Sequence, residues 1–536
     1  MVLTKTKLIN ILIIVFFAFF FTTTINWDHN YSWHPDERMI IMTGLKLKPL
    51  LPWEKGFFSP NSPFNPKFFA YGSLPIYVVT LFKYLFTSDF YQITLHLRWL
   101  NFLVLIILGL IIQKLTFSFT HSSKTSLLAF WFTFTTFFLW QNAHFYTVDL
   151  SLTLWFTLTL YLLIRFWQTS SSAPYPFFVG LVLAAGLATK FTMILIFPLV
   201  FFIFILKPQT SLSAKPRSLI ITFISFLIFF FLFQPYAFID FITYKNQLLA
   251  QIKMSRSAYT FPYTLQYVNT PAYIYPLKQI ILWGIGPFLS FLALLGVFFA
   301  LPKFVEKSFF KPPFLIFTAF NLFYFAILGK SAVKFMRYYL PLYPLLIILS
   351  ALGIFYLSQQ KYQGRVASIT FFLVSTLFFT SFAVIHLKTP TRLQAARWLD
   401  AQYPIIKTIG VEHWDDRLPT RQPFKSIEFP MYNFERTLPT QTAKRRLINH
   451  NLFQIDAYVI ASPRLYKPLL KLAHQYPVAA AFYTDLFNLR TPFEFKHSFT
   501  NYPKFLFWTI NDSSADESFY VYDHPPVFIF TKKSTK

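Results

Sequence analysis

The amino-acid sequence contains no cysteine, so disulfide bonds, thiolate catalysis and cysteine-bound metal sites are excluded. Charge is also scarce: Asp, Glu, Lys and Arg make up 13% of the 536 residues, whereas a soluble domain has about 25%. There is no Gly-x-x-x-x-Gly-Lys-[Ser/Thr] motif, which excludes ATP-driven transport through a P-loop of this chain. The shortage of charge indicates that lipid surrounds most of the protein.

Hydrophobic residues supply 55% of the chain, including 73 phenylalanines, which we interpret as lipid-facing bulk. The mean hydropathy is +0.47. Lys and Arg outnumber Asp and Glu by 48 to 21, which gives a formal net charge of +27. The basic residues are spread between hydrophobic runs and form no dense patch, so nucleic acid is not an expected partner. Membrane lipids with anionic headgroups and a phosphate-bearing substrate remain as expected partners.

The hydrophobic runs predict a polytopic membrane protein. A transmembrane helix needs about 20 mostly apolar residues. Eleven segments with almost no charge in their interiors fit this requirement: 8–26, 97–115, 126–142, 148–165, 176–190, 191–206, 218–235, 279–301, 314–329, 338–357 and 366–386.

The segment 74–86 decides the orientation of the chain. It is short and contains Lys83, so we expect a helix that lies in the membrane interface rather than a span. Most basic loops then fall on the side of the N-terminus, which the positive-inside rule identifies as cytoplasmic. We therefore expect a multi-pass protein of the cell (plasma) membrane whose C-terminal domain is extracytoplasmic. The first span lacks a small-residue cleavage site and is interpreted as a retained anchor.

From about residue 388 the composition changes, because charges become frequent and long apolar runs stop. We expect a transmembrane domain over 1–387 and a small extracytoplasmic α/β domain over 388–536, long enough for its own core. The fold class is thus mainly α, with about eleven transmembrane helices. Within 388–536 the pattern predicts strands at 405–411 and 457–460, a helix at 463–474, and two strands, 519–522 and 527–530, around a turn.

Acids and cations are expected together at the outward ends of these nearly uncharged spans. Asp36 and Glu37 lie in the first outer loop, 27–73, and Asp149 begins a later span. A membrane-surface transferase with a lipid-phosphate donor needs both kinds of charge. A carboxylate can act as general base on an acceptor hydroxyl, and cations stabilise the phosphate as it leaves. The cations at outward ends include Lys67, Lys190 and Arg337.

Each of these residues also has a simpler interpretation. Loop charges beside a bilayer can be solvated or paired with lipid headgroups. Asp149 can be an N-terminal helix acid favoured by the helix dipole, and Lys190 and Arg337 can extend to the interface. His144 can be an interfacial polar residue, and Tyr338 fits an aromatic belt.

A metal site is possible but is not specified by the sequence. His34, Asp36 and Glu37 offer suitable donor atoms. They lack a fixed spacing such as His-Glu-x-x-His, which a dedicated zinc site would show. A divalent metal therefore stays possible, and no cofactor is certain.

The polar stretches, taken in order along the chain, are similar to those of a known group of membrane enzymes. They include His34-Pro35-Asp36-Glu37, Asn65-Pro66-Lys67, Tyr71-Gly72-Ser73-Leu74-Pro75, Arg98, Thr147-x-Asp149, Gly186-Leu187-Ala188-Thr189-Lys190, Arg337-Tyr338-Tyr339-Leu340-Pro341 and Val521-Tyr522-Asp523-His524-Pro525. Together they resemble the GT-C membrane glycosyltransferases. More narrowly, they resemble a bacterial branch of the superfamily that contains the protein O-mannosyltransferases and the aminoarabinose transferases. The resemblance extends over nearly the whole chain.

The resemblance implies a polyprenyl-phosphate or dolichyl-phosphate sugar donor. It also implies inverting transfer on the non-cytoplasmic face to a glycan, lipid or protein acceptor. Asp36 corresponds to the base or acceptor-positioning acid, Glu37 to its acidic neighbour and Asp149 to a second acidic position. The resemblance further implies that Lys190, Arg337, Lys67 and Arg98 contact the donor phosphate, and that His34, Tyr338 and His144 line the rest of the pocket.

Two positions depart from the aminoarabinose transferases. Those enzymes have a Glu-Lys-Pro-Pro-like stretch where this chain has Asn65-Pro66-Lys67. They also favour an arginine three residues after the first acid, where this chain has Met39. These departures concern the donor contacts and leave the identity of the sugar open.

The sequence therefore predicts an integral-membrane glycosyltransferase in which Asp36 accepts the proton of the attacking hydroxyl. A secondary transporter or lipid flippase is the alternative. Transporters, however, place charge near the bilayer midplane and are built from repeated halves, whereas these charges lie at the outer edge and no repeat is detected. A third interpretation is a non-catalytic membrane anchor that presents the C-terminal domain.

Overall fold

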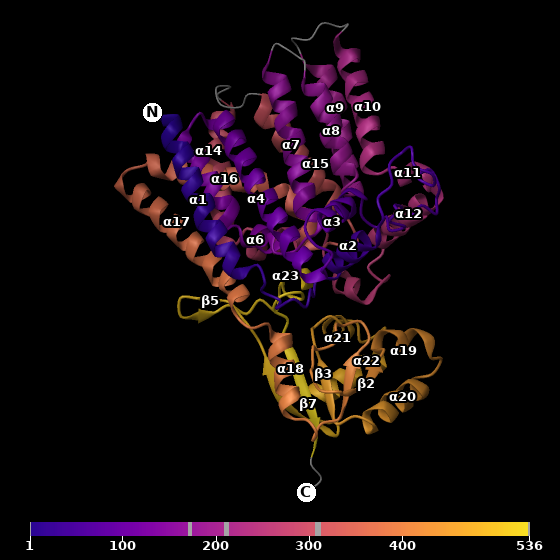
Figure 1. Ribbon diagram of the computed structural model, residues 1–536. Coiled ribbons are helices and arrows are strands. Elements are labelled where there is room, and N and C mark those ends of the chain that lie inside the picture. Colours follow the sequence, from indigo (N-terminus) through magenta and orange to yellow (C-terminus); the bar gives the residue numbers. More distant parts are fainter. Residues whose placement is uncertain (1, 170–173, 208–213, 306–311, 534–536) are drawn as a thin grey trace. The chain divides into compact units, whose positions relative to one another are not determined.

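The computed structural model describes residues 2–169, 174–207, 214–305 and 312–533 (Figure 1). The chain divides into two compact units, and the second joins two short loop segments to the C-terminal part of the chain. Unit 1 comprises Met1–Ile25, His34–Lys253 and Ala272–Ala383; unit 2 comprises Asn26–Trp33, Met254–Pro271 and Val384–Lys536.

The regular secondary structure of unit 1 is helical, and each predicted span contains helix, whereas the segment 47–73 is irregular. Its long apolar elements are α1 (Val2–Thr24), α4 (Phe90–Thr120), α5 (Ser123–Thr135), α6 (Phe137–Ala143), α7 (Val148–Gln168), α8 (Tyr175–Leu187), η1 (Phe191–Ile196), α9 (Phe197–Leu206), α10 (Ala214–Phe233), α14 (Pro287–Val305), α15 (Pro312–Leu328), η4 (Met336–Leu342), α16 (Tyr343–Gln359) and α17 (Tyr362–Ala383). The shorter elements are α2 (Pro35–Lys46), α3 (Leu74–Leu85), α11 (Tyr236–Ile239), α12 (Phe241–Arg256), α13 (Ile274–Gln279) and η3 (Ile280–Gly284).

By length and composition, 6 of the described helices can each cross a membrane, or up to 7 if one bent pair counts as a span. The chain is thus a multi-pass membrane protein of mainly α-helical fold. The predicted interfacial segment 74–86 forms α3, whose 12 residues reach only about 18 Å. The qualifying helices are Lys5–Thr24, Phe90–Thr120, Val148–Gln168, Lys215–Phe233, Met336–Gln359 and Tyr362–Ala401.

Two predicted spans are not continuous helices. The prediction of one helix over 279–301 is wrong, because the pair Ile274–Gly284 and Pro287–Phe299 is bent by 114°. Gly286 has φ +83, a conformation open to glycine, and the following proline starts a new helix. The span 126–142 is divided at Thr136, whose backbone is extended between α5 and α6.

Close helix contacts in unit 1 depend on glycine. A Cβ on Gly296 of α14 would lie 2.0 Å from the Leu349 carbonyl oxygen of α16. In the reverse direction, a Cβ on Gly353 of α16 would lie 2.1 Å from the Leu292 carbonyl oxygen. In lipid, where helices are not driven together by the hydrophobic effect, such small residues permit the close packing that holds helices together.

Unit 2 has the mixed α/β structure expected for 388–536, but it also includes Asn26–Trp33 and Met254–Pro271, which lie within the range predicted for the transmembrane domain. Its sheet has the order β2-β1-β3-β7-β4, in which β1 is parallel to β2 and β3, while β7 is antiparallel to β3 and β4. Ile409, Val411, Val459 and Ile529 form part of its buried core. The strands are β1 (Thr408–Glu412), β2 (Lys425–Phe429), β3 (Ala457–Ile460), β4 (Phe493–Phe499), β5 (Lys504–Phe505), β6 (Trp508–Thr509) and β7 (Val527–Lys532). The helices are η2 (Pro262–Tyr267), η5 (Val384–Leu387), α18 (Thr391–Ala401), α19 (Met431–Thr437), α20 (Gln441–Phe453), α21 (Tyr466–Lys471), α22 (Pro477–Phe487) and α23 (Glu517–Tyr520).

The predicted strand at 519–522 is wrong. Phe519 and Tyr520 end α23, and 521–522 form a turn. The helix starts because the Asp516 side chain accepts a hydrogen bond from the Ser518 N–H and caps it. Asp523 and His524 are buried rather than exposed in a hairpin turn, with exposed fractions of 3% each. The run of aromatic and β-branched residues had suggested a strand, but the local cap decides the conformation. The helix predicted over 463–474 is also shorter and ends at Lys471.

Glu412 gives unit 2 an expected pH dependence. It ends β1, is buried, and accepts hydrogen bonds from the hydroxyls of Tyr458 and Tyr483. Burial raises the pKa of Glu412 from 4.5 to about 8, so the folded protein favours its protonated form and this contribution to stability is lost as the pH rises through about 8. We expect thermal unfolding of unit 2 to shift to lower temperature between about pH 6 and about pH 9. The Glu412→Gln variant should show a smaller shift; equal shifts in both proteins would contradict the assignment.

Candidate active site

The first helix after the N-terminal span presents two acids to two different partners. The α2 helix begins at Pro35, and the Nδ1 atom of its cap, His34, accepts a hydrogen bond of 3.3 Å from the Asp36 N–H. Proline suits the first turn because its missing N–H is not needed there. Asp36 and Glu37 both lie in this turn, where the helix dipole favours negative charge. Adjacent helical side chains point about 100° apart, so the two carboxylates diverge.

Asp36 belongs to a cluster with three other predicted site residues. Its carboxylate is paired with the Nη1 atom of Arg337, which comes from η4. The Nε atom of Arg337 is 3.8 Å from Oδ2 of Asp149, at the start of α7. Oδ1 of Asp149 accepts a hydrogen bond of 2.6 Å from the Nζ atom of Lys190, between α8 and η1. Four separate elements thus bring two carboxylates and two cations into one chain of contacts.

The accessibility of the cluster is uneven. The Asp36 side chain is 20% exposed, whereas that of Asp149 is 3% exposed. The side chains of Arg337 and Lys190 are 10% and 12% exposed. Asp36 is therefore the acid of this cluster that an incoming group can reach most easily.

Two tyrosines complete the surroundings of these charges. The Lys190 ammonium lies 4.3 Å from the ring centroid of Tyr338, a cation–π contact. Tyr71 hydrogen-bonds the Asp36 carboxylate. Burial and the charge of Asp36 raise the pKa of Tyr71 well above 10.0, so its hydroxyl stays protonated and donates. Tyr71 lies in the Tyr71-Gly72-Ser73-Leu74-Pro75 motif but was not among the predicted site residues.

The electrostatic setting keeps Asp36 ionised. Burial alone raises the pKa of its carboxyl. The charges of Arg337 and Lys190, with the hydrogen bond from Tyr71, outweigh burial and hold the pKa of Asp36 below its ordinary value of 3.8. Asp36 is thus a carboxylate at neutral pH and can accept a hydrogen bond or a proton.

The loop that carries Tyr71 is docked directly on the segment that carries Lys190. The Gly72 N–H donates to the Thr189 carbonyl oxygen at 3.0 Å, and the Leu74 N–H donates to the Ala188 carbonyl oxygen at 3.0 Å. A Cβ on Gly72 would lie 1.8 Å from the Ala188 carbonyl oxygen. Glycine at this position therefore sets the spacing between the Asp36–Tyr71 side of the cluster and its Lys190 side.

The close contact at Gly72 predicts that adding one methyl group there, in Gly72→Ala, lowers turnover strongly. Gly72→Ala should displace the Tyr71 loop from the Lys190 segment, because neither backbone can yield without breaking the two hydrogen bonds. Misplacement of reacting groups by about 1 Å can cost roughly 100-fold in rate. Turnover by the purified variant, measured beside Gly109→Ala, tests this prediction, since a Cβ on Gly109 would approach nothing closer than the Phe130 side chain at 3.1 Å. Equal activities of the two variants would contradict it.

Glu37 and Arg98 lie apart from this chain of contacts. Arg98 Nε and Nη2 donate to the two oxygens of Glu37 at 2.9 and 2.7 Å. Glu37 also accepts from the Tyr146 N–H at 2.8 Å, and Arg98 Nη1 donates to the Ile25 carbonyl oxygen at 3.0 Å. Both side chains are buried, with exposed fractions of 0% and 1%. The pair joins α2 to α4, and its charged groups bond to each other and to the backbone.

Lys67, which was predicted to contact the donor phosphate, is paired with a carboxylate outside the cluster. Its Nζ atom is 3.0 Å from Oδ2 of Asp240, which also accepts from Asn65 Nδ2 at 2.8 Å. The Lys67 side chain is 46% exposed. The structure thus places Lys67 in a loop clasp with Asp240 rather than in the four-residue cluster.

His144 packs among helices rather than in the cluster. Its Nε2 atom is 2.8 Å from the Thr24 hydroxyl and its Nδ1 atom is 2.9 Å from the Trp140 carbonyl oxygen. Its ring centroid lies 4.4 Å from that of Phe21 in α1. Within the described ranges, no group of three or more His, Asp or Glu side chains that could hold a metal ion is found.

Comparisons with known proteins identify the fold. No protein-family model matches the chain, and no curated protein matches it. Among solved structures, the Archaeoglobus fulgidus oligosaccharyltransferase in the apo form has a TM-score of 0.51 and 13% identity, and the match covers 88% of this chain and 72% of that one. A. fulgidus AglB in complex with an inhibitory peptide and a dolichol-phosphate has a TM-score of 0.50 and 12% identity, over 84% of this chain and 68% of that one.

A third solved structure, ArnT from Cupriavidus metallidurans bound to undecaprenyl phosphate, has a TM-score of 0.49 and 12% identity. That match covers 88% of this chain and 94% of the other. The two matches with the oligosaccharyltransferase confirm the expected fold class, a mainly α-helical polytopic membrane protein with a small C-terminal sheet region.

Proposed function

We propose that the protein is an integral-membrane glycosyltransferase. It moves a sugar from a polyprenyl-phosphate donor to an acceptor hydroxyl with inversion, and Asp36 is the base. One observation carries the proposal: Asp36, Asp149, Lys190 and Arg337 come from four elements and form one contiguous cluster. The fold similarity supports the same class, since AglB, at 12% identity, was solved with a dolichol-phosphate.

The charges of the cluster balance within the protein. Two carboxylates face two cations, so each cation has a carboxylate partner from the chain itself. A donor phosphate would compete with Asp36 for Arg337 and with Asp149 for Lys190. As Arg337 turns toward the phosphate, the cation that lowers the pKa of Asp36 moves away, and Asp36 becomes a stronger base. Binding of the donor thus prepares the acid that the reaction needs.

The proposed reaction is a single displacement. The acceptor oxygen forms a bond to the anomeric carbon as the bond from that carbon to the phosphate oxygen breaks. The hydroxyl proton passes to Asp36, and the bonding electrons leave with the polyprenyl phosphate. Arg337 and Lys190 stabilise the charge that develops on this phosphate. Asp149 holds both cations in position, and Tyr71 orients Asp36 through its hydrogen bond.

The remaining predicted site residues receive supporting roles in this proposal. Glu37 and Arg98 brace α2 against α4, because their charges are satisfied by each other and by the backbone. Lys67 holds the outer loop through Asp240. His34 caps α2, and His144 supports helix packing. The extracytoplasmic side is proposed for the cluster and for the C-terminal domain from the distribution of basic loops.

Mass spectrometry tests the proposed class of reaction. Glycans, glycolipids and glycoproteins from cells with the gene should contain a hexose or pentose addition that is missing from cells without it. The Asp36→Asn protein should fail to restore this addition. Identical glycan, glycolipid and glycoprotein profiles, with an ion or lipid transport defect instead, would favour a transporter or flippase.

A further inference from the structure

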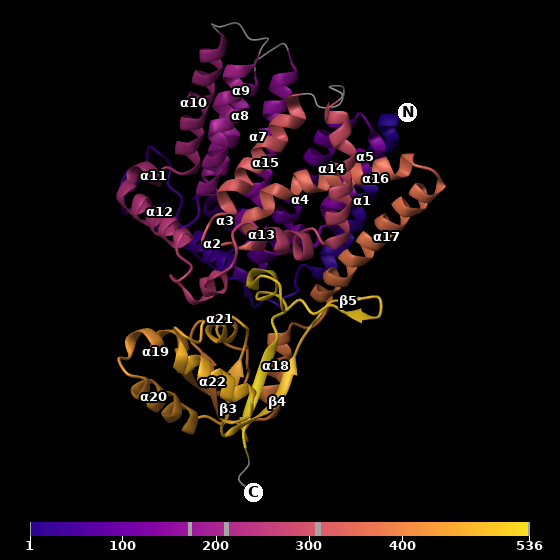
Figure 2. The ribbon, with the colours of Figure 1, turned by 180° about the vertical axis from the view of Figure 1, so that it is seen from behind.

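A small hairpin of unit 2 carries large apolar side chains at its tip. Strands β5 and β6 pair through Phe505 and Trp508, and Leu506 and Phe507 form the turn between them. The exposed fractions of Leu506, Phe507 and Trp508 are 58%, 96% and 67%. Within unit 2, the hairpin extends away from the five-stranded sheet in both views (Figures 1 and 2).

The residues of this turn do not suit the turn itself. Leu506 has φ +54, and two-residue hairpin turns with positive φ strongly prefer Asn, Asp or Gly at such positions. Leucine there costs backbone free energy, and leucine followed by two exposed aromatic residues also presents apolar surface to water. The stability of the hairpin therefore does not explain why Leu506, Phe507 and Trp508 stand at its tip. Contact of these side chains with an apolar medium does explain it.

The base of the hairpin is tied to the chain just after the last membrane helix. Asn501 Nδ2 donates to the Thr389 carbonyl oxygen at 2.8 Å, and Gln394 Nε2 donates to the same oxygen at 2.6 Å. Thr389 follows closely on Ala383, where α17 ends. The intervening residues can span at most about 20 Å. The covalent chain therefore keeps the base of the hairpin near the surface of the bilayer that α17 can cross.

The charges beside the tip also suit a lipid surface. Lys504 at the start of β5 is exposed, and Lys388 beside Thr389 is half-buried. Leu387, next to Lys388, adds another exposed apolar side chain, with an exposed fraction of 54%. Lysines next to exposed tryptophan and leucine match the interfacial zone, where cations meet phosphate headgroups and aromatic rings lie below them.

We infer that the tip of the β5–β6 hairpin inserts into the interfacial region of the bilayer and holds unit 2 to the membrane surface. The partner is phospholipid. Leu506 and Phe507 enter the acyl boundary, Trp508 lies at headgroup depth, and Lys504 contacts phosphate. This inference does not depend on the proposed glycosyl transfer, because it uses only the position and the composition of the hairpin.

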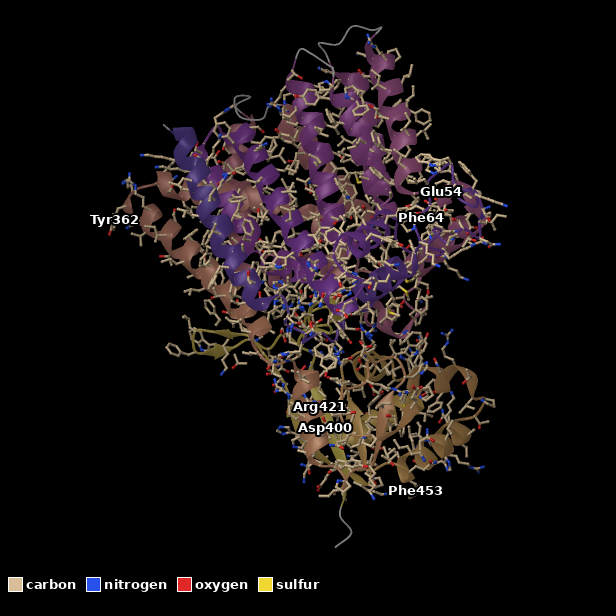
Figure 3. All side chains as sticks on the ribbon, in the orientation of Figure 1. Glu54, Phe64, Tyr362, Asp400, Arg421 and Phe453 are labelled. Carbon is tan, nitrogen blue, oxygen red and sulfur yellow. The ribbon has the colours of Figure 1, made fainter. Side chains whose placement is uncertain are left out.

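The absence of cysteine permits a direct test in the full-length protein. Phe507→Cys and Trp508→Cys place single thiols at exposed positions, where a nitroxide label does not disturb packing. Phe453→Cys is the matched control, because Phe453 is an apolar residue of unit 2 with an exposed fraction of 75% at the end of α20 (Figure 3). The labelled proteins are reconstituted in phospholipid vesicles, and collisions of each label with oxygen and with a water-soluble nickel chelate are measured.

For each label we compare the ratio of its collision rate with oxygen to its collision rate with the nickel chelate. This ratio should be several-fold higher for the labels at 507 and 508 than for the label at 453, because oxygen concentrates in lipid. Labels at 507 and 508 that are as accessible to the nickel chelate as the label at 453 would overturn the inference. Protection of both labels from both reagents would also overturn it, since that pattern indicates burial against protein, including a second copy of the chain.

Discussion

Replacing Asp36 with asparagine is expected to slow sugar transfer by about 100- to 10,000-fold, the usual contribution of a general base. Asparagine keeps the shape of the side chain and can still accept the hydrogen bond of Tyr71, so α2 should keep its position. The amide cannot take the hydroxyl proton, and it no longer balances the charge of Arg337. Turnover of the purified variant with a polyprenyl-phosphate sugar donor is the measurement.

Asp240→Asn is the matched control for this experiment. Asp240 is another acid of unit 1 that pairs with a cation, Lys67, but it lies outside the cluster. We expect its removal to change turnover by less than tenfold, because the Lys67–Asp240 pair lies outside the cluster and the Lys67 side chain is 46% exposed. Wild-type turnover by folded Asp36→Asn protein would reject Asp36 as the base. Equal losses in the two variants would indicate a general effect of loop charge.

Replacing Glu37 with glutamine is expected to destabilise the protein by about 3–5 kcal/mol, the usual cost of removing one partner from a buried ion pair. The change leaves the Arg98 guanidinium buried without its counter-charge, although Arg98 keeps its bond to the Ile25 carbonyl oxygen. The measurement is thermal unfolding in detergent, followed by intrinsic fluorescence. The midpoint of the variant should fall well below that of the wild type.

The double variant Glu37→Gln/Arg98→Met provides the control. Removal of both charges leaves no uncompensated ion, so part of the lost stability should return. Such a recovery of stability would indicate that Glu37 and Arg98 hold α2 against α4. It would argue against the catalytic and phosphate-binding roles that the resemblance implies for them. Unchanged stability of Glu37→Gln together with a loss of turnover would contradict the brace and restore Glu37 as a catalytic candidate.

Much of the helical fold can be predicted from sequence patterns that do not depend on contacts between distant residues. Apolar runs such as those of α4 and α7 predict helices because lipid leaves the backbone no other way to pair its polar groups. Breaks within such runs are harder to predict. Gly286 and Pro287 could have been identified as a break in 279–301 from their local chemistry. The division at Thr136 has no comparable local signal.

The α/β unit was predictable as a class but less so in its details. Short buried strands such as β3 are apolar throughout and stand out in the sequence. The segment 519–522 is also apolar and aromatic, yet its first two residues end a helix that Asp516 caps, and the other two form a turn. Periodicity cannot separate these outcomes in so short a run. The cap residue was the signal that could have done so.

The candidate site also has a part that the sequence predicts and a part that it does not. Asp36, Asp149, Lys190 and Arg337 were expected together, since each stands out in a nearly uncharged region, and the structure places them in contact. Glu37 is adjacent to Asp36 in sequence, but its helical direction leads it to Arg98. That divergence requires knowing that α2 starts at Pro35, which the Pro-Asp-Glu pattern could have suggested.

Tyr71 and Gly72 were harder to assign. Tyrosine is common in interfacial loops, and only the docking of Gly72 on Thr189 brings Tyr71 to the carboxylate of Asp36. Contacts between segments so far apart in sequence depend on the assembled helices and have no local pattern.

Equilibrium binding of a polyprenyl phosphate to the purified protein tests the central claim most directly, because it requires no knowledge of the sugar or the acceptor. Loss of a charged hydrogen bond costs about 1.5–3 kcal/mol, so Arg337→Met and Lys190→Met should each weaken binding by roughly 10- to 150-fold. Lys67→Met should bind nearly as the wild type does, because Lys67 is engaged by Asp240. Wild-type affinity in both Arg337→Met and Lys190→Met would contradict the account.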